Sequence, residues 1–338
     1  MNFNAGKAAG SAEKQNNLKL AVFMAFLSCA MCAVSAFSGF AFTSFLAAAA
    51  LSFILLRTNC PIAALISAAV SFGVCYLITS SPITASQIVL YAATGAVFAL
   101  FKKKKVGFFK TFAALGLCFA LITAFFAALS IRANYGEIVA GAKEIYNNYY
   151  NATFEYIKSA ISVDDTVLLT DNEIRDVLSL ATSILPGIAA AFAELIGAAL
   201  YAICKVFVNV VSPNSERRYP GEYAIPRWAV VFFTVSFILS LIFSAISKLN
   251  PAHVTAMNLA VVLCVPVLFD GAFRLARKLK AAASFRINSG GSRPKTGFIL
   301  AALVISAFFS IVFPFIILIV YSVAGTVKDI IKSGAAKK

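Results

Sequence analysis

Long apolar segments alternate with short polar ones along the whole chain. As helices, most of these segments are long enough to cross the roughly 30 Å hydrocarbon layer of a bilayer, although the second and fourth are short for it. The pattern predicts an all-α fold, a polytopic transmembrane bundle of about nine spans, with a range of about eight to ten. The segments lie at about 18–37, 40–56, 61–80, 86–101, 107–131, 184–211, 228–247, 253–273 and 296–324.

Composition supports a membrane location. Apolar residues make up 61% of the chain, charged residues only 13%, and the mean hydropathy is +0.88, far from the values of soluble domains. The formal charge of +15 does not indicate nucleic acid binding, because the cations flank apolar segments where they meet lipid headgroups. The seven cysteines lie in or beside apolar segments, which is typical of small core residues rather than disulfides.

The positive residues separate into alternate gaps between the apolar segments. If the N-terminus is cytoplasmic, twenty of the 29 Lys and Arg residues fall on that side, as expected for short cytoplasmic loops. We therefore expect a multi-pass protein of the bacterial cell (inner) membrane with a cytoplasmic N-terminus. The twenty are Lys7, Lys14, Lys19, Arg57, Lys102 to Lys105, Lys110, Lys205, Arg217, Arg218, Arg227 and the seven from Arg274 to Lys295.

The C-terminal lysines conflict with this arrangement. Nine spans would carry Lys328, Lys332, Lys337 and Lys338 to the outer side, against the charge rule. Either the last apolar segment, interrupted at Pro314, is a broken hairpin or re-entrant element, or the tail is an exception. The nine-span arrangement is the one we expect.

Three regions follow from these spans. Residues 1–17 form a cytoplasmic N-terminal tail, and residues 18–211 form a six-span membrane region that includes an outer helical loop at 133–183. Residues 212–338 form a C-terminal membrane region of about three spans with basic cytoplasmic loops.

The outer loop is patterned for helices. Apolar residues recur at steps of three and four and give one Tyr-rich helix face, which we expect to rest at the membrane interface; a lid over an outward-facing cavity is the alternative. A second helix is predicted to begin at Thr170, because Thr170 and Glu173 have the spacing of a capping box. The residues of the Tyr-rich face are Ile138, Ala142, Ile145, Tyr149, Thr153 and Tyr156.

Two acidic residues lie within apolar segments, where a charge is costly and therefore a candidate for function. Glu194 lies roughly 12 Å into the sixth span. It is either a ligand or proton site, or a neutral side chain that packs against a neighbouring helix. Asp270 precedes Arg274 by one helical turn, and we expect the two to form a structural ion pair.

The first span carries small residues at every fourth position, Ala21, Ala25, Cys29 and Ala33. Such a stripe lets another helix approach closely. Its partner is either another helix of this chain or a separate membrane protein.

The chain shows no set of residues typical of an enzyme. His253 is the only histidine, and no nucleotide-binding glycine motif is present. Cys29 and Cys32 form a C-x-x-C in mid-span, which is no setting for redox chemistry. We therefore expect no catalytic residue, no metal site and no cofactor.

Several short motifs carry a resemblance to known families. The six-helix part up to residue 211, with its striped first helix, resembles the substrate-binding subunits of energy-coupling-factor vitamin transporters. The whole chain resembles the YybS-like family of uncharacterised bacterial membrane proteins. The motifs are Leu56-Arg57-Thr58-Asn59-Cys60-Pro61, Leu185-Pro186-Gly187, Tyr223-Ala224-Ile225-Pro226-Arg227-Trp228 and Phe269-Asp270-Gly271-Ala272-Phe273.

Two functions remain open at this point. The first is a transport-related membrane subunit that binds a small solute near Glu194, and the resemblance implies that the small-residue stripe docks a coupling partner. The second is a non-transporting membrane scaffold or regulator of cell-envelope processes. The lipid bilayer is the partner that both functions share.

Overall fold

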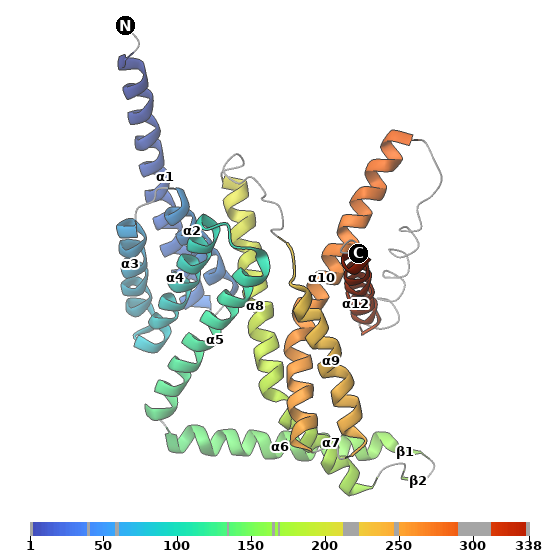
Figure 1. Ribbon diagram of the computed structural model, residues 1–338. Helices are drawn as coiled ribbons and strands as arrows, with labels where there is room; N and C mark the ends of the chain where they lie inside the picture. The colour runs from blue at the N-terminus through green and yellow to red at the C-terminus, as the bar shows by residue number, and fades with distance from the viewer. Residues whose placement is uncertain are drawn as a thin grey trace. The chain divides into compact units, whose positions relative to one another are not determined.

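A computed structural model describes residues 3–38, 41–57, 61–133, 135–163, 166–167, 170–211, 223–246, 250–289 and 312–335. These residues form eleven helices and one short hairpin (Figure 1), which confirms the predicted all-helical membrane fold. The chain divides into two compact units. The first comprises Met1–Gly141 and Ala193–Glu222, and the second comprises Ala142–Phe192 and Tyr223–Lys338.

The first unit contains five helices and most of a sixth. Helix α2 lies at its core, packed against α1 and α4, and the run from Ala47 to Ala50 is fully buried. Proline begins α3 and α4, at a position where a helix needs no backbone donor. The helices are α1 (Phe3–Ser38), α2 (Ala41–Arg57), α3 (Pro61–Thr79), α4 (Pro82–Lys103), α5 (Phe108–Ala133) and α8 (Leu185–Val211).

The residues before the first apolar segment are helical as well. Helix α1 begins at Phe3, so residues 3–17 and the first apolar segment form one helix. The composition explains this continuity, since Ala, Lys, Glu and Gln are strong helix formers. The placement of residues 1–17 in the cytoplasm stays a prediction.

The second unit contains the outer loop and the C-terminal helices. Helix α10 packs against both α9 and α12, and α12 also touches α9. The elements are α6 (Tyr135–Ile161), β1 (Ser162–Val163), β2 (Thr166–Val167), α7 (Asp171–Ser183), α9 (Arg227–Ser244), α10 (Pro251–Ser289) and α12 (Val312–Ala335).

Six helices among the described residues are long and apolar enough to cross a membrane: α3, α5, α8, α9, α10 and α12. Residues 18–34 and 45–56 form shorter apolar helices in α1 and α2. Each of the nine predicted spans coincides with a helix, although residues 296–311 of the last one lie outside the described residues. These helices imply contact with the lipid bilayer.

The outer loop forms α6 and α7, joined by the antiparallel pair β1 and β2. The predicted capping box at the start of α7 is confirmed: the Thr170 side chain accepts from the Glu173 backbone, and the Glu173 carboxylate accepts from the Thr170 backbone. Phe154 of α6 packs on Ile174 and Leu178 of α7.

The Tyr-rich face of α6 does not pack on α7. Ile145, Tyr149 and Tyr156 are each more than 70% exposed. The neighbouring face that carries Tyr150, Phe154 and Ile157 is the one that covers α7. Interfacial placement of the exposed Tyr-rich face, where tyrosine is favoured, stays a prediction.

The amide of Asn258 in α10 holds the junction between α7 and α8. Its Oδ1 accepts from the Gly187 backbone N–H at 2.6 Å, and its Nδ2 donates to the Ser183 carbonyl at 3.0 Å. Gly187 has no Cβ, and a Cβ there would lie 2.9 Å from the Asn258 Cα. These backbone groups lie at a break between two helices, where the helix itself leaves them without partners. Asn258 thus attaches the end of the outer loop to α10.

We expect Asn258→Leu to lower the free energy of unfolding by about 2 kcal/mol, because a backbone donor and an acceptor lose their partner. Asn258→Asp keeps the acceptor for Gly187 but turns a second oxygen toward the Ser183 carbonyl, so we expect it to destabilise as well. Chemical unfolding in detergent micelles measures both. Thr255→Val, one turn away on an exposed position, is the control, and an equal loss there would contradict the role of Asn258.

Helix α12 crosses its neighbours steeply. Figure 1 shows it almost end-on where α9 and α10 run along the page. The contacts agree, since Leu318, Ser322 and Asp329 of α12 all meet the short stretch of α10 from Asp270 to Arg274. Pro314 lies in the first turn of α12 and does not interrupt it within the described residues.

Candidate functional site

A buried polar network joins α10 to α12 in the second unit. Asp270 is only 3% exposed, and its Oδ2 accepts hydrogen bonds from Arg274 Nε and Ser322 Oγ, both at 2.6 Å. The four-residue spacing places Asp270 and Arg274 on one face of α10, and the structure brings them together as an ion pair.

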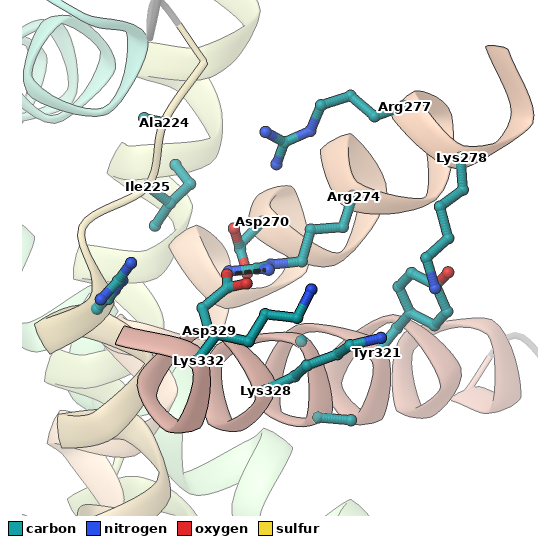
Figure 2. Close-up of a pocket in the computed structure, with 13 residues that line it drawn as sticks. Ala224, Ile225, Asp270, Arg274, Arg277, Lys278, Tyr321, Lys328, Asp329 and Lys332 are labelled. Carbon is teal, nitrogen blue, oxygen red and sulfur yellow. Dashed lines mark hydrogen bonds and ion pairs between the residues drawn. The ribbon is translucent and has the colours of Figure 1, made fainter. Parts of the chain in front are cut away.

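Arg274 also reaches across to α12. Its Nη1 lies 2.7 Å from Asp329 Oδ2 (Figure 2). Its Nη2 lies 3.3 Å from Thr326 Oγ1. The planar guanidinium serves several acceptors at once, which an ammonium group cannot do with the same geometry. Arg274 is therefore fully engaged by this chain.

Two glycines make room for this crossing. At Gly271 an added Cβ would lie 2.8 Å from the carbonyl carbon of Leu318, so the backbones of α10 and α12 touch there. At Gly325 an added Cβ would lie 2.8 Å from Arg274 Nη1. Small residues at helix crossings allow such close approach within membranes.

Beside this network lies a pocket of about 590 Å³, whose walls come from the start of α9, from α10 and from α12. Six cationic residues and two carboxylates line it, which leaves a formal charge of +4. Both carboxylates are bound to Arg274. The cationic residues are Arg227, Arg274, Arg277, Lys278, Lys328 and Lys332.

The other five cationic residues of the pocket have weaker interactions with the protein than Arg274 has. Within the described part of the chain, Arg227, Arg277, Lys328 and Lys332 form no ion pair at salt-bridge distance, and Lys278 lies 4.6 Å above the Tyr321 ring (Figure 2). The start of α9 adds positive potential, because no side chain caps its N-terminus at Pro226. The pocket is therefore suited to an anion.

The network also places the basic residues of α12 relative to those of α9 and α10. Because Asp329 binds Arg274, the neighbouring residues Lys328 and Lys332 line the same pocket as Arg227 and Arg277. This contradicts the expectation that nine spans carry these lysines to the side opposite Arg274. The steep crossing of α12 explains the difference, while Lys337 and Lys338 lie outside the described residues.

Glu194 belongs to the first unit, whereas the residues that line the pocket belong to the second. It is at a close contact between α5 and α8, where an added Cβ on Gly116 would lie 3.1 Å from the Glu194 Cα. Gly197 touches α5 in the same way at Phe112 and Gly116. Glu194 Oε2 is buried and has no hydrogen-bond partner among the described residues.

The small-residue stripe of α1 lies against helices of its own chain. Ala21 is 3% exposed, and the carbonyl of Ala25 accepts from Ser67 Oγ of α3 at 3.4 Å. Cys29 and Ala33 are partly exposed. The exposed face of α1 carries large residues instead, Val22, Phe23 and Phe26 among them.

Sequence reasoning found Asp270 and Arg274 but missed the pocket around them. A usable signal was present in the last apolar segment. Tyr321, Gly325, Lys328 and Lys332 recur at steps of three and four, so they share one helix face, and all four line the pocket. Ser322, Thr326 and Asp329 follow the same spacing and supply the network.

Apolar helices of membrane-crossing length around buried polar contacts define a multi-pass helical membrane protein. The chain belongs to the family described as "Predicted membrane protein (DUF2232)", whose profile matches residues 22–327. The resemblance to YybS-like proteins is consistent with that membership. No curated protein and no solved structure matches the chain.

Proposed function

We propose that this protein is a membrane-embedded binding protein for an anion that carries phosphate or carboxylate groups. The observation that carries the proposal is the pocket in the second unit, where five cations surround a space whose two carboxylates both bind Arg274. Cations held close together repel one another, and a bound anion relieves that repulsion. The charge distribution predicts that this side is cytoplasmic.

A transport-related role for this binding protein draws on the resemblance to vitamin-binding subunits. The anion pocket then replaces Glu194 as the proposed solute site, because the close contact of α5 and α8 favours helix packing at Glu194. The chain has no nucleotide-binding motif, so transport would use the energy of a partner or of an ion gradient.

A second candidate is a scaffold or regulator that binds the anion without moving it. Packing next to the pocket favours this role. Val230 and Phe233 of α9 and Leu263 and Val267 of α10 form a buried core there, with Ile319 and Val323 of α12 against it. A solute moving along these helices would have to displace that core.

Thermal unfolding tests the anion site. The full-length protein in an uncharged detergent is titrated with inorganic pyrophosphate or citrate, with NaCl holding the ionic strength constant. We expect the unfolding midpoint to rise, since a ligand at 100 times its Kd stabilises the folded state by about 2.7 kcal/mol. The rise should shrink in the double variant Lys328→Gln, Lys332→Gln.

The matched control is Lys104→Gln, Lys110→Gln, which removes the same charge from exposed positions outside the pocket. We expect it to respond as the unchanged protein does. Equal responses of the two double variants, or no rise beyond that given by chloride, would refute the proposed anion site.

A further inference from the structure

We infer that the anion is the headgroup of an anionic phospholipid, with its phosphate in the pocket and its acyl chains against the neighbouring helices. This inference rests on the anion-binding function proposed above and names its ligand. It depends on where the pocket lies along the helices and on the surface that surrounds it.

Trp228 marks the depth of the pocket. It is the only tryptophan in the chain, it is 51% exposed, and it directly follows Arg227 in the first turn of α9. Tryptophan is enriched at the boundary between hydrocarbon and headgroups. The pocket, which Arg227 lines, therefore opens at the level of lipid phosphates.

Apolar surface continues from the pocket on two helices. Helix α9 exposes large apolar side chains directly after Trp228, and α12 exposes others before its pocket-lining residues. In a bilayer these surfaces contact acyl chains, so a molecule with a charged head and apolar chains fits both regions at once. The exposed residues are Val231, Phe232 and Val235 of α9 and Phe315, Ile316 and Val320 of α12.

The cations come from three separate helices. Arg277 and Lys278 belong to α10, and Lys328 and Lys332 belong to α12 (Figure 2). Arg227 begins α9. Basic pockets between transmembrane helices are a recurring form of headgroup site. A volume of about 590 Å³ lies in the range of small-ligand pockets and accommodates a glycerophosphate head. One phosphate can thus bridge α10 and α12 from the membrane side.

The hydroxyl of Tyr321 offers a further point of contact. Tyr321 lines the pocket, and its Oη is buried with no hydrogen-bond partner in the part of the chain that the structure describes. A buried hydroxyl usually has a partner, and a rotation of the Tyr321 side chain on binding would let a phosphate oxygen accept its hydrogen bond.

Native mass spectrometry of the full chain in lipid nanodiscs tests the inference. The discs contain phosphatidylglycerol and phosphatidylcholine at a ratio of one to three, and bound lipid is counted after release from the disc. We expect retained phosphatidylglycerol on the unchanged protein. In Lys328→Gln, Lys332→Gln its apparent affinity should fall about tenfold or more, as for two lysines near an anionic headgroup.

Lys104→Gln, Lys110→Gln should keep its phosphatidylglycerol, and phosphatidylcholine binding should be equal in all three proteins. Soluble glycerol 3-phosphate should displace the lipid poorly, because it lacks the apolar part. Size-exclusion profiles show whether the double lysine variant folds. If it does not, Arg277→Gln is the second pocket variant, and we expect it to lose phosphatidylglycerol as well.

Equal loss of phosphatidylglycerol from the pocket variant and the control would overturn the inference, since the lipid would then be bound at no particular site. If pyrophosphate stabilises the protein but phosphatidylglycerol is not retained, the inference is wrong and the anion site stands. If neither anion binds, both proposals fall.

Discussion

Replacing Arg274 by Met is expected to lower the free energy of unfolding by about 3–5 kcal/mol, the usual cost of removing one partner of a buried ion pair. Asp270 would stay buried with its charge opposed by no cation at ion-pair distance, and α12 would lose its contacts through Asp329 and Thr326. Chemical unfolding in micelles measures the loss.

Two further variants check the cause. Arg277→Met makes the same chemical change on an exposed position one turn along α10, and we expect a loss of less than about 1 kcal/mol there. Adding Asp270→Asn to Arg274→Met should recover part of the lost stability, because it removes the unpaired buried charge. Failure of the second change to recover anything would contradict the assignment of the loss to Asp270.

Gly271→Ala is expected to destabilise the protein by about 2–3 kcal/mol, because the added methyl group meets the backbone of Leu318, which cannot move as a side chain does. Either α12 shifts away from α10 or the two helices separate. The pocket depends on that crossing, so pyrophosphate should also lose its stabilising effect.

Gly73→Ala is the matched control for this steric effect. Nothing lies within 4 Å of the Cβ position of Gly73, which is in the middle of α3. Alanine is the better helix former, so a gain of up to about 1 kcal/mol is expected there. A loss at Gly73 as large as that at Gly271 would show that the helix crossing is not the cause.

Much of the fold follows from local sequence. Helices such as α3, α9 and α10 coincide with apolar segments, because a membrane helix must satisfy its own backbone and present apolar side chains along its length. The ion pair between Asp270 and Arg274 also follows from local sequence. A spacing of four residues brings two side chains together in any helix, whatever surrounds it.

The rest of the site depends on contacts between distant segments. Asp329 and Ser322 lie 55 and 52 residues from the groups they bind, and the crossing of α12 over α10 alone brings them there. The spacing of the polar residues in α12 could have shown that they share one helix face, but not what that face contacts. The count of nine spans placed Lys328 and Lys332 on the outer side, against the charge rule, and a span count says nothing of a helix that crosses its neighbours steeply.

For helix α6, the sequence pattern could not show which face is covered. The steps of three and four that selected Ile145, Tyr149 and Tyr156 also fit Tyr150, Phe154 and Ile157, and the second set is the one that packs on α7. A helix with two apolar faces has no local feature that decides which one is covered. Only the position of α7 decides it.

The three-way attachment of Arg274 has a consequence for how the family varies. One guanidinium binds Asp270, Thr326 and Asp329 at the same time, so no single replacement there preserves all three contacts. Lysine would keep the charge and lose the fork geometry. Substitution at position 274 during divergence should therefore be accompanied by substitution at 270, 326 and 329, and the four positions should change as a set.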